Sequence, residues 1–164
     1  MIKKVRLYLD TSVISYLDQK DYPERMKQTQ ELWSILKTGK YEIVVSSIAL
    51  SEIGDCKEEK AEILMQYLSD INYIYYEAND NTNELAKMII DEGILTKKSF
   101  DDATHIASAL LSDADIILSW NFKHLVNIET IKGVRQISFK NNFNRNIDIY
   151  SPNILLNKGD DEND

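Results

Sequence analysis

The chain of 164 residues has little cysteine, proline or glycine and no long hydrophobic run. Its single cysteine, Cys56, excludes an internal disulfide and fits a reducing compartment, so we expect a cytoplasmic protein. No uninterrupted apolar stretch approaches the roughly 20 residues needed to cross a bilayer, which argues against a membrane protein. The apolar start of the chain is interrupted by Asp10 and Asp18 and does not resemble a secretory signal.

The chain also has fewer basic than acidic residues. It contains 19 Lys and Arg and 27 Asp and Glu, which gives a net charge of −8. Four of the acids lie in residues 158–164, which have almost no apolar content. We therefore expect an acidic, mobile tail there and a single domain over residues 1–157. An acidic chain is not expected to bind nucleic-acid backbones broadly and non-specifically. A nucleic-acid enzyme remains open, since carboxylates that surround divalent metal ions contribute to such a total.

Strand and helix patterns alternate along the chain. The expected strands are apolar or β-branched runs at 5–9, 41–46, 71–76, 115–119 and 134–139. The expected helices have apolar residues at helical spacing at 23–39, 47–53, 61–68, 85–93, 103–111 and, as a short last turn, from 151. This alternation predicts an α/β domain whose mainly parallel sheet is covered by helices on both faces. In such sheets ligands gather beyond the carboxyl ends of the strands.

Acidic and amide side chains follow these strand ends. Asp10 comes directly after the first strand, and Glu52 follows the second by about one and a half helical turns. Asp102 opens the helix before the fourth strand, and Asn121 follows that strand. Clustered carboxylates repel one another unless cations lie between them. Oxygen ligands without a His or Cys cluster suit Mg²⁺ or Mn²⁺, which can activate a water and balance the charge of a phosphate.

Each acid also has an ordinary structural explanation. Asp10 is in a position to cap the following helix, and Glu52 alone is typical of a solvated helix residue. The pair Asp101 and Asp102 at a helix start would complement the helix dipole. Their common order relative to the strand ends favours a shared site, because independent surface acids have no reason to follow it.

Four segments together carry a resemblance to a known family. They are YLDTSVISYL at 8–17, VVSSIALSEI at 44–53, SFDDATHIASAL at 99–110 and ILSWNFKHL at 117–125. In this order the chain resembles PIN-domain proteins, and more narrowly the VapC-type toxins of toxin–antitoxin pairs. The resemblance implies a three-layer α/β/α sandwich and Mg²⁺- or Mn²⁺-dependent hydrolysis of RNA phosphodiesters. It also implies an antitoxin protein as a possible partner and a homodimer.

The resemblance also assigns site residues position by position. Asp10, Glu52 and Asp102 match the family's metal-binding and catalytic acids, with Asp101 a weaker match than its neighbour. The family commonly has a further aspartate where this chain has Asn121. An asparagine can coordinate a cation but brings no negative charge, so Asn121 is expected to be a weaker metal ligand.

Polar residues beside these positions are candidates for substrate binding. Thr11 and Ser12 are predicted to hydrogen-bond a carboxylate or the scissile phosphate, with helix capping by Ser12 as the alternative. Lys123 and His124 are expected either to touch RNA phosphates or to lie in a solvated loop. His105 lies three residues after Asp102 and off the main apolar stripe. We expect it on the helix surface or supporting a ligand, rather than acting as a base or metal ligand.

Two functions therefore remain open. The first is a metal-dependent ribonuclease, restrained as a toxin by an antitoxin. The second is a PIN-like binding module with weak or no catalysis that acts through RNA or protein contacts. The set Asp10, Glu52 and Asp102 favours the enzyme, whereas Asn121 and the acidic surface favour the module.

Overall fold

A computed structural model describes residues 2–143 and 146–156, so the tail expected at 158–164 lies outside the described residues. The strands are β1 (Arg6–Leu9), β2 (Glu42–Ser46), β3 (Ile74–Tyr76), β4 (Ile116–Leu118) and β5 (Asp148–Tyr150). The α-helices are α1 (Thr11–Ser15), α2 (Pro23–Leu36), α3 (Ser47–Gly54), α4 (Glu58–Ser69), α5 (Asp80–Asp91), α6 (Phe100–Leu111) and α7 (Ile128–Lys140). Short 3-10 helices are η1 (Tyr16–Asp18), η2 (Lys97–Ser99) and η3 (Pro152–Leu155).

The five strands form one parallel sheet in the order β3-β2-β1-β4-β5. β1 is central, with Leu7 paired to Ile43 of β2 on one side and to Ile116 of β4 on the other. Along the chain, β2 and β3 are added on one side of β1, and β4 and β5 are then added on its other side. The strand order therefore switches between β1 and β4. Ligand sites of open parallel sheets form at such a switch, beyond the carboxyl ends of the strands.

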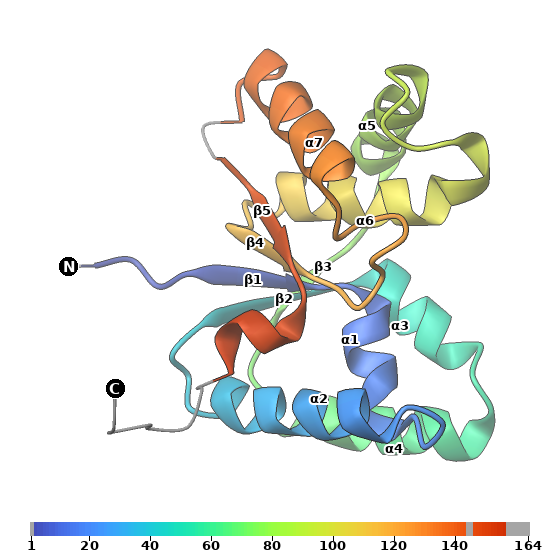
Figure 1. Cartoon of the computed structure of the whole chain (residues 1–164), viewed down its shortest axis with the longest axis vertical. Coiled ribbons are helices and arrows are strands. Elements are labelled where there is room, and N and C mark those ends of the chain that lie inside the picture. Colours follow the sequence, from blue (N-terminus) through green and yellow to red (C-terminus); the bar gives the residue numbers. More distant parts are fainter. Residues whose placement is uncertain (1, 144–145, 157–164) are drawn as a thin grey trace.

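Helices cover both faces of the sheet. Leu7 and Leu9 of β1 pack into one core and Tyr8 into the other, as the alternation of side chains along a strand requires. α5, α6 and α7 lie over the Tyr8 face, and α1, α2, α3 and α4 lie over the opposite face (Figure 1). The sequence prediction of a three-layer α/β/α sandwich with a parallel sheet is thus confirmed.

The last predicted strand is wrong, because residues 134–139 belong to helix α7. Thr130, Val134 and Ile137 are buried at helical spacing, while Phe139 remains 85% exposed. The Asn127 side chain accepts a hydrogen bond from the Thr130 backbone and caps the helix. The fifth strand is instead the short edge strand β5, of which only the central residue, Ile149, is fully buried.

The helix that carries Glu52 is fixed at its start by a side-chain cap. Ser46, the last residue of β2, accepts a hydrogen bond from the Ala49 backbone at 3.2 Å. Within the described ranges no helix is both long and apolar enough to cross a membrane.

Candidate functional site

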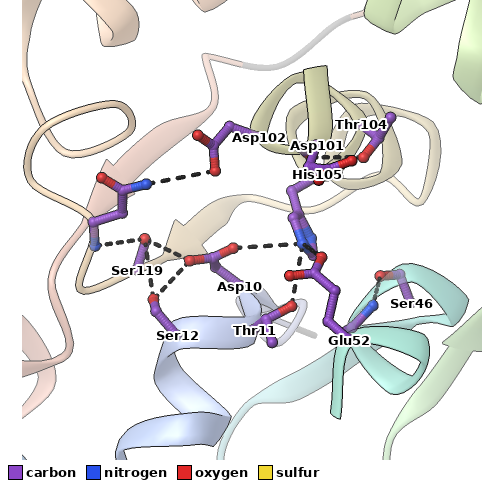
Figure 2. Close-up of polar contacts among 12 residues, drawn as sticks. Asp10, Thr11, Ser12, Ser46, Glu52, Asp101, Asp102, Thr104, His105 and Ser119 are labelled. Carbon is purple, nitrogen blue, oxygen red and sulfur yellow. Dashed lines mark hydrogen bonds and ion pairs between the residues drawn. The ribbon is translucent and has the colours of Figure 1, made fainter. Parts of the chain in front are cut away.

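Asp10 lies at the switch between β1 and β4 and directs its carboxylate into the site. It is 5% exposed, and its backbone N–H donates to the Leu118 carbonyl of β4 at 3.0 Å. The hydroxyls of Ser12 and Ser119 donate to Asp10 Oδ2 at 2.6 and 2.8 Å (Figure 2). Asp10 occupies the N-cap position of α1, but its side chain makes no capping hydrogen bond. Helix capping therefore does not account for this carboxylate.

His105 of α6 lies between two of the predicted site acids. Its Nε2 atom is 2.8 Å from Glu52 Oε1 and 3.6 Å from Asp10 Oδ1 (Figure 2). The hydroxyl of Thr11 lies 3.2 Å from the same nitrogen. One ring nitrogen thus brings Asp10 and Glu52 together. The expectation that His105 lies on the helix surface is wrong, because the residue is 2% exposed, although its place beside two acids fits a supporting role.

The other ring nitrogen of His105 faces a buried hydroxyl. Nδ1 lies 2.6 Å from the Tyr8 hydroxyl, which donates to Ser46 Oγ at 2.8 Å. Burial raises the pKa of Tyr8 far above its ordinary value, so this hydroxyl keeps its proton. With the Tyr8 proton directed at Ser46, the Tyr8 oxygen can accept a proton from Nδ1, while Nε2 donates to Glu52. Both ring nitrogens then donate, as in a charged imidazolium.

The electrostatic surroundings of His105 agree with that charge. Burial works against protonation of the ring, but the hydrogen bond to Glu52 and the negative charges of Asp10, Glu52 and Asp102 outweigh it and raise the pKa. In its protonated form the His105 ring offsets part of the negative charge at the carboxyl edge of the sheet.

Asp102 is the member of the acidic pair on α6 that faces the site. Asp101 is exposed, whereas Asp102 is half-buried. Burial, followed by the negative charge of Asp10, raises the pKa of Asp102, and the charges of His124 and His105 oppose this shift. Asp102 and Asp10 therefore lie close enough to repel each other, which is the situation that a cation between them would relieve.

Asn121 closes the turn after β4. Its side-chain oxygen accepts a hydrogen bond from the His124 backbone at 2.9 Å, and its amide nitrogen donates to Asp102 Oδ1 at 3.4 Å. The atom that faces the acids is therefore a hydrogen-bond donor and not a metal ligand. In this geometry Asn121 supports Asp102, and the prediction that it binds metal would require its oxygen to leave the turn.

The four residues predicted to contact substrate have different surroundings. The Ser12 hydroxyl donates to Asp10 and accepts from the Trp120 backbone at 2.9 Å, so it holds the carboxylate. Thr11 contacts His105 as described above. Lys123 is exposed in the loop after β4, and His124 is half-buried with Nδ1 3.5 Å from the Ser99 hydroxyl. Substrate binding by Lys123 and His124 stays a prediction.

The oxygen ligands of the site fit Mg²⁺ or Mn²⁺ bound by few protein atoms. In the part of the chain that the structure describes, no three His, Cys, Asp or Glu side chains form a ready metal cage. Mg²⁺ does not require one, because it commonly uses one or two carboxylates and completes its shell with waters and substrate phosphate oxygens. Asp10 and Asp102 supply two mutually repelling carboxylates of this kind. The side chain of Glu52 is 40% exposed and is connected to Asp10 by His105, which contacts both acids.

Comparison with known proteins finds similarity at the level of structure. No protein-family model matches the sequence, and no curated protein matches it. A chain of VapBC2 from Rickettsia felis, in a crystal structure with a DNA fragment from the promoter, matches with a TM-score of 0.53 and 18% identity over 90% of this chain and 98% of that one. A chain of VapBC-1 from nontypeable Haemophilus influenzae matches with a TM-score of 0.53 and 15% identity over the same shares. The likeness to VapC-type PIN domains expected from the sequence is thus confirmed for the fold, and the chain has the PIN-like α/β fold of these VapBC structures.

Proposed function

We propose that this protein is a Mg²⁺- or Mn²⁺-dependent ribonuclease that hydrolyses RNA phosphodiester bonds. The observation that carries the proposal is the buried carboxylate of Asp10, held by two serine hydroxyls at the strand-order switch and repelled by Asp102. Keeping a carboxylate buried beside another acid is unfavourable unless a cation occupies the site during function.

The described residues divide the work of such a reaction. Asp10 and Asp102 would hold the cation, which, when bound, activates a water and balances charge on the scissile phosphate. Ser12 and Ser119 fix Oδ2 of Asp10 and thereby the direction of the whole carboxylate. Glu52, held at Oε1 by His105, would orient the attacking water with its other oxygen.

We further propose that the enzyme is the toxin of a toxin–antitoxin pair and forms a homodimer. The support is the fold, which is shared with chains of two VapBC structures over 90% of this chain. An antitoxin would then be a protein that covers the carboxyl edge of the sheet and blocks access of RNA to Asp10.

Cleavage of a fluorescently labelled single-stranded RNA tests the enzyme proposal. We expect cleavage with Mg²⁺ or Mn²⁺ and none with a chelator. Asp10→Asn and Asp102→Asn should each lower the rate by at least about 100-fold, because an amide cannot supply the charge that holds the cation. Asp101→Asn is the matched control, since Asp101 is exposed on the same helical turn and should keep the native rate. A folded Asp10→Asn protein that cleaves RNA at the native rate would rule out this assignment.

A PIN-like binding module with weak or no catalysis is the second candidate. It is favoured by the two cationic or donor groups that already lie against the acids, namely the His105 ring and the Asn121 amide. A module of this kind would bind single-stranded RNA or a protein equally well in Mn²⁺ and in chelator. It would leave the RNA intact in both.

A further inference from the structure

Arg25 lies among four aromatic rings at the surface. Its guanidinium carbon is 5.2 Å from the ring centroid of Phe122, 5.5 Å from Trp120, 5.9 Å from Tyr16 and 6.0 Å from Tyr22. All four distances are within the range of a cation–π interaction. We call these five residues the Arg25 cluster. It joins η1 and the start of α2 to the loop after β4.

In the part of the chain that the structure describes, the charge of Arg25 has no carboxylate partner. Among residues 2–143 and 146–156, no carboxylate lies within 4.0 Å of its guanidinium, whereas Arg6 and Arg135 pair with Glu42 and Asp148. An arginine without an acid is unexpected in a chain with a net charge of −8. The planar guanidinium is suited to phosphate oxygens, and here its orientation is already restricted by the rings.

The rings differ in exposure. Trp120 is 5% exposed and donates from Nε1 to the Thr29 hydroxyl at 3.0 Å, so it forms the floor of the cluster. Tyr22 and Phe122 are 52% and 44% exposed. These two exposed rings lie beside a guanidinium that pairs with no carboxylate of the described residues. This arrangement matches the way single-stranded nucleic acid is bound, in which bases stack on rings and a cation contacts the backbone.

The Arg25 cluster adjoins the acidic site. The Trp120 backbone donates to Ser12 Oγ, and Ser12 donates to Asp10. Phe122 follows Asn121, whose amide donates to Asp102. Because the acids themselves repel phosphates, an RNA strand that reaches Asp10 needs a cation close by. Arg25 lies on α2 and contacts the Trp120 and Phe122 rings of the loop that closes the site, so it is positioned to supply this cation.

We propose that the Arg25 cluster binds a nucleotide of single-stranded RNA next to the bond to be cut, with Arg25 on a phosphate and Tyr22 and Phe122 stacked on a base. The proposal rests on the proposed function for its choice of RNA and adds the preference for unpaired strands. Bases in a duplex cannot leave their stack to lie on these rings, so duplex RNA should bind weakly.

Fluorescence anisotropy with the full chain, in chelator so that no RNA is cut, tests the proposal. The probes are a labelled single-stranded RNA of ten nucleotides and mixed sequence and the corresponding duplex. Arg25→Gln and the double variant Tyr22→Ala/Phe122→Ala should each weaken single-strand binding by about 5- to 100-fold. Arg25→Lys should fall between Arg25→Gln and wild type, because it keeps the charge and loses the planar fork.

Two matched controls separate the Arg25 cluster from general surface effects. Lys27→Gln removes one exposed charge from the same helix, and Tyr75→Ala removes a ring that is 52% exposed on β3. Both should bind the single strand like wild type. Melting curves identify any variant that fails to fold, and Arg25→Gln and the double variant test the cluster independently of each other.

Several outcomes would overturn the proposal. Native single-strand binding by both cluster variants would do so, as would equal losses in the controls or equal binding of single strand and duplex. If the double variant instead abolishes self-association in sedimentation and leaves RNA binding intact, the cluster is an interface between copies. If the wild-type protein cleaves RNA but the cluster variants bind it as tightly as wild type, the proposal for the Arg25 cluster fails and the enzyme proposal stands. If the cluster variants bind RNA weakly but the wild-type protein does not cleave it, the enzyme proposal fails and the proposal for the cluster stands.

Discussion

At the scale of single residues, the site is a set of acids whose charges are only partly offset. His105 and the hydroxyls of Ser12 and Ser119 stabilise Asp10, and the Asn121 amide supports Asp102. These groups hold the acids in position, but burial and the negative charge of Asp10 still raise the pKa of Asp102. The remaining negative charge would attract a divalent cation.

Asn121→Asp tests how much repulsion the site tolerates. The new carboxylate can keep the hydrogen bond from the His124 backbone but would place a negative charge where an amide now donates to Asp102. We expect a lower melting temperature than wild type in chelator and a larger rise on adding Mn²⁺, because the cation is attracted by one more charge. An equal metal-induced rise in both proteins would show that residue 121 acts only in the turn.

The sequence predicted Asp10, Glu52 and Asp102 as site candidates because their positions follow the strand ends, and the structure brings Asp10 and Glu52 to one histidine. The sequence did not reveal that His105 is buried, because a single polar residue off the main apolar stripe is typical of a helix surface. A usable signal was the composition of α6. Apart from His105, its residues from Ala103 to Leu110 are apolar or small, and all of them are buried, as in a helix covered on every side.

At the scale of elements, the strands with continuous apolar runs were predictable and β5 was not. β1, β2 and β4 lie in the middle of the sheet, where both faces are covered and the strands contain the apolar runs Leu7–Leu9, Ile43–Val45 and Ile116–Leu118. β5 is an edge strand that begins with Asp148 and has only Ile149 fully buried, so it shows no apolar run. The run at 134–139 contains β-branched residues but belongs to α7, whose buried residues repeat at helical and not alternating intervals.

Gly133 shows how closely α7 packs against the turn after α5. A Cβ at this position would lie 2.7 Å from Cγ1 of Ile94. We expect Gly133→Ala to destabilise the protein by roughly 1–2 kcal/mol, because the overpacking outweighs the gain in helix propensity. Urea unfolding measures the difference.

The control is the same substitution in an Ile94→Ala background. There the clash is gone, and Gly133→Ala should be neutral or stabilising by up to about 1 kcal/mol. A stabilising effect of Gly133→Ala in the native sequence would mean that Ile94 moves aside without cost.

At the scale of the whole molecule, the buried charge of His105 links stability to pH. Its pKa is raised above the ordinary value of 6.5 in the folded protein, so the folded state binds the proton more tightly than the unfolded chain. The stabilisation from His105 is therefore fully present below pH 6.5 and is lost as pH rises through the folded pKa.

We expect the free energy of unfolding in chelator to fall between pH 6.5 and the folded pKa of His105. His105→Gln should lose this part of the pH dependence, because glutamine keeps a hydrogen-bond donor but does not titrate. His124→Gln is the matched control and should retain it. A wild-type curve that rises with pH over this range would contradict the assignment of a charged His105.

The central claim is that Asp10 and Asp102 share a divalent cation at the switch between β1 and β4. Anomalous diffraction from crystals soaked in Mn²⁺ tests it most directly, with Asp10→Asn crystals treated in the same way. We expect a peak roughly 2 Å from carboxylate oxygens of Asp10 and Asp102 in the native protein and none at that position in the variant. A native crystal saturated with Mn²⁺ that shows no peak between these two carboxylates would contradict the account.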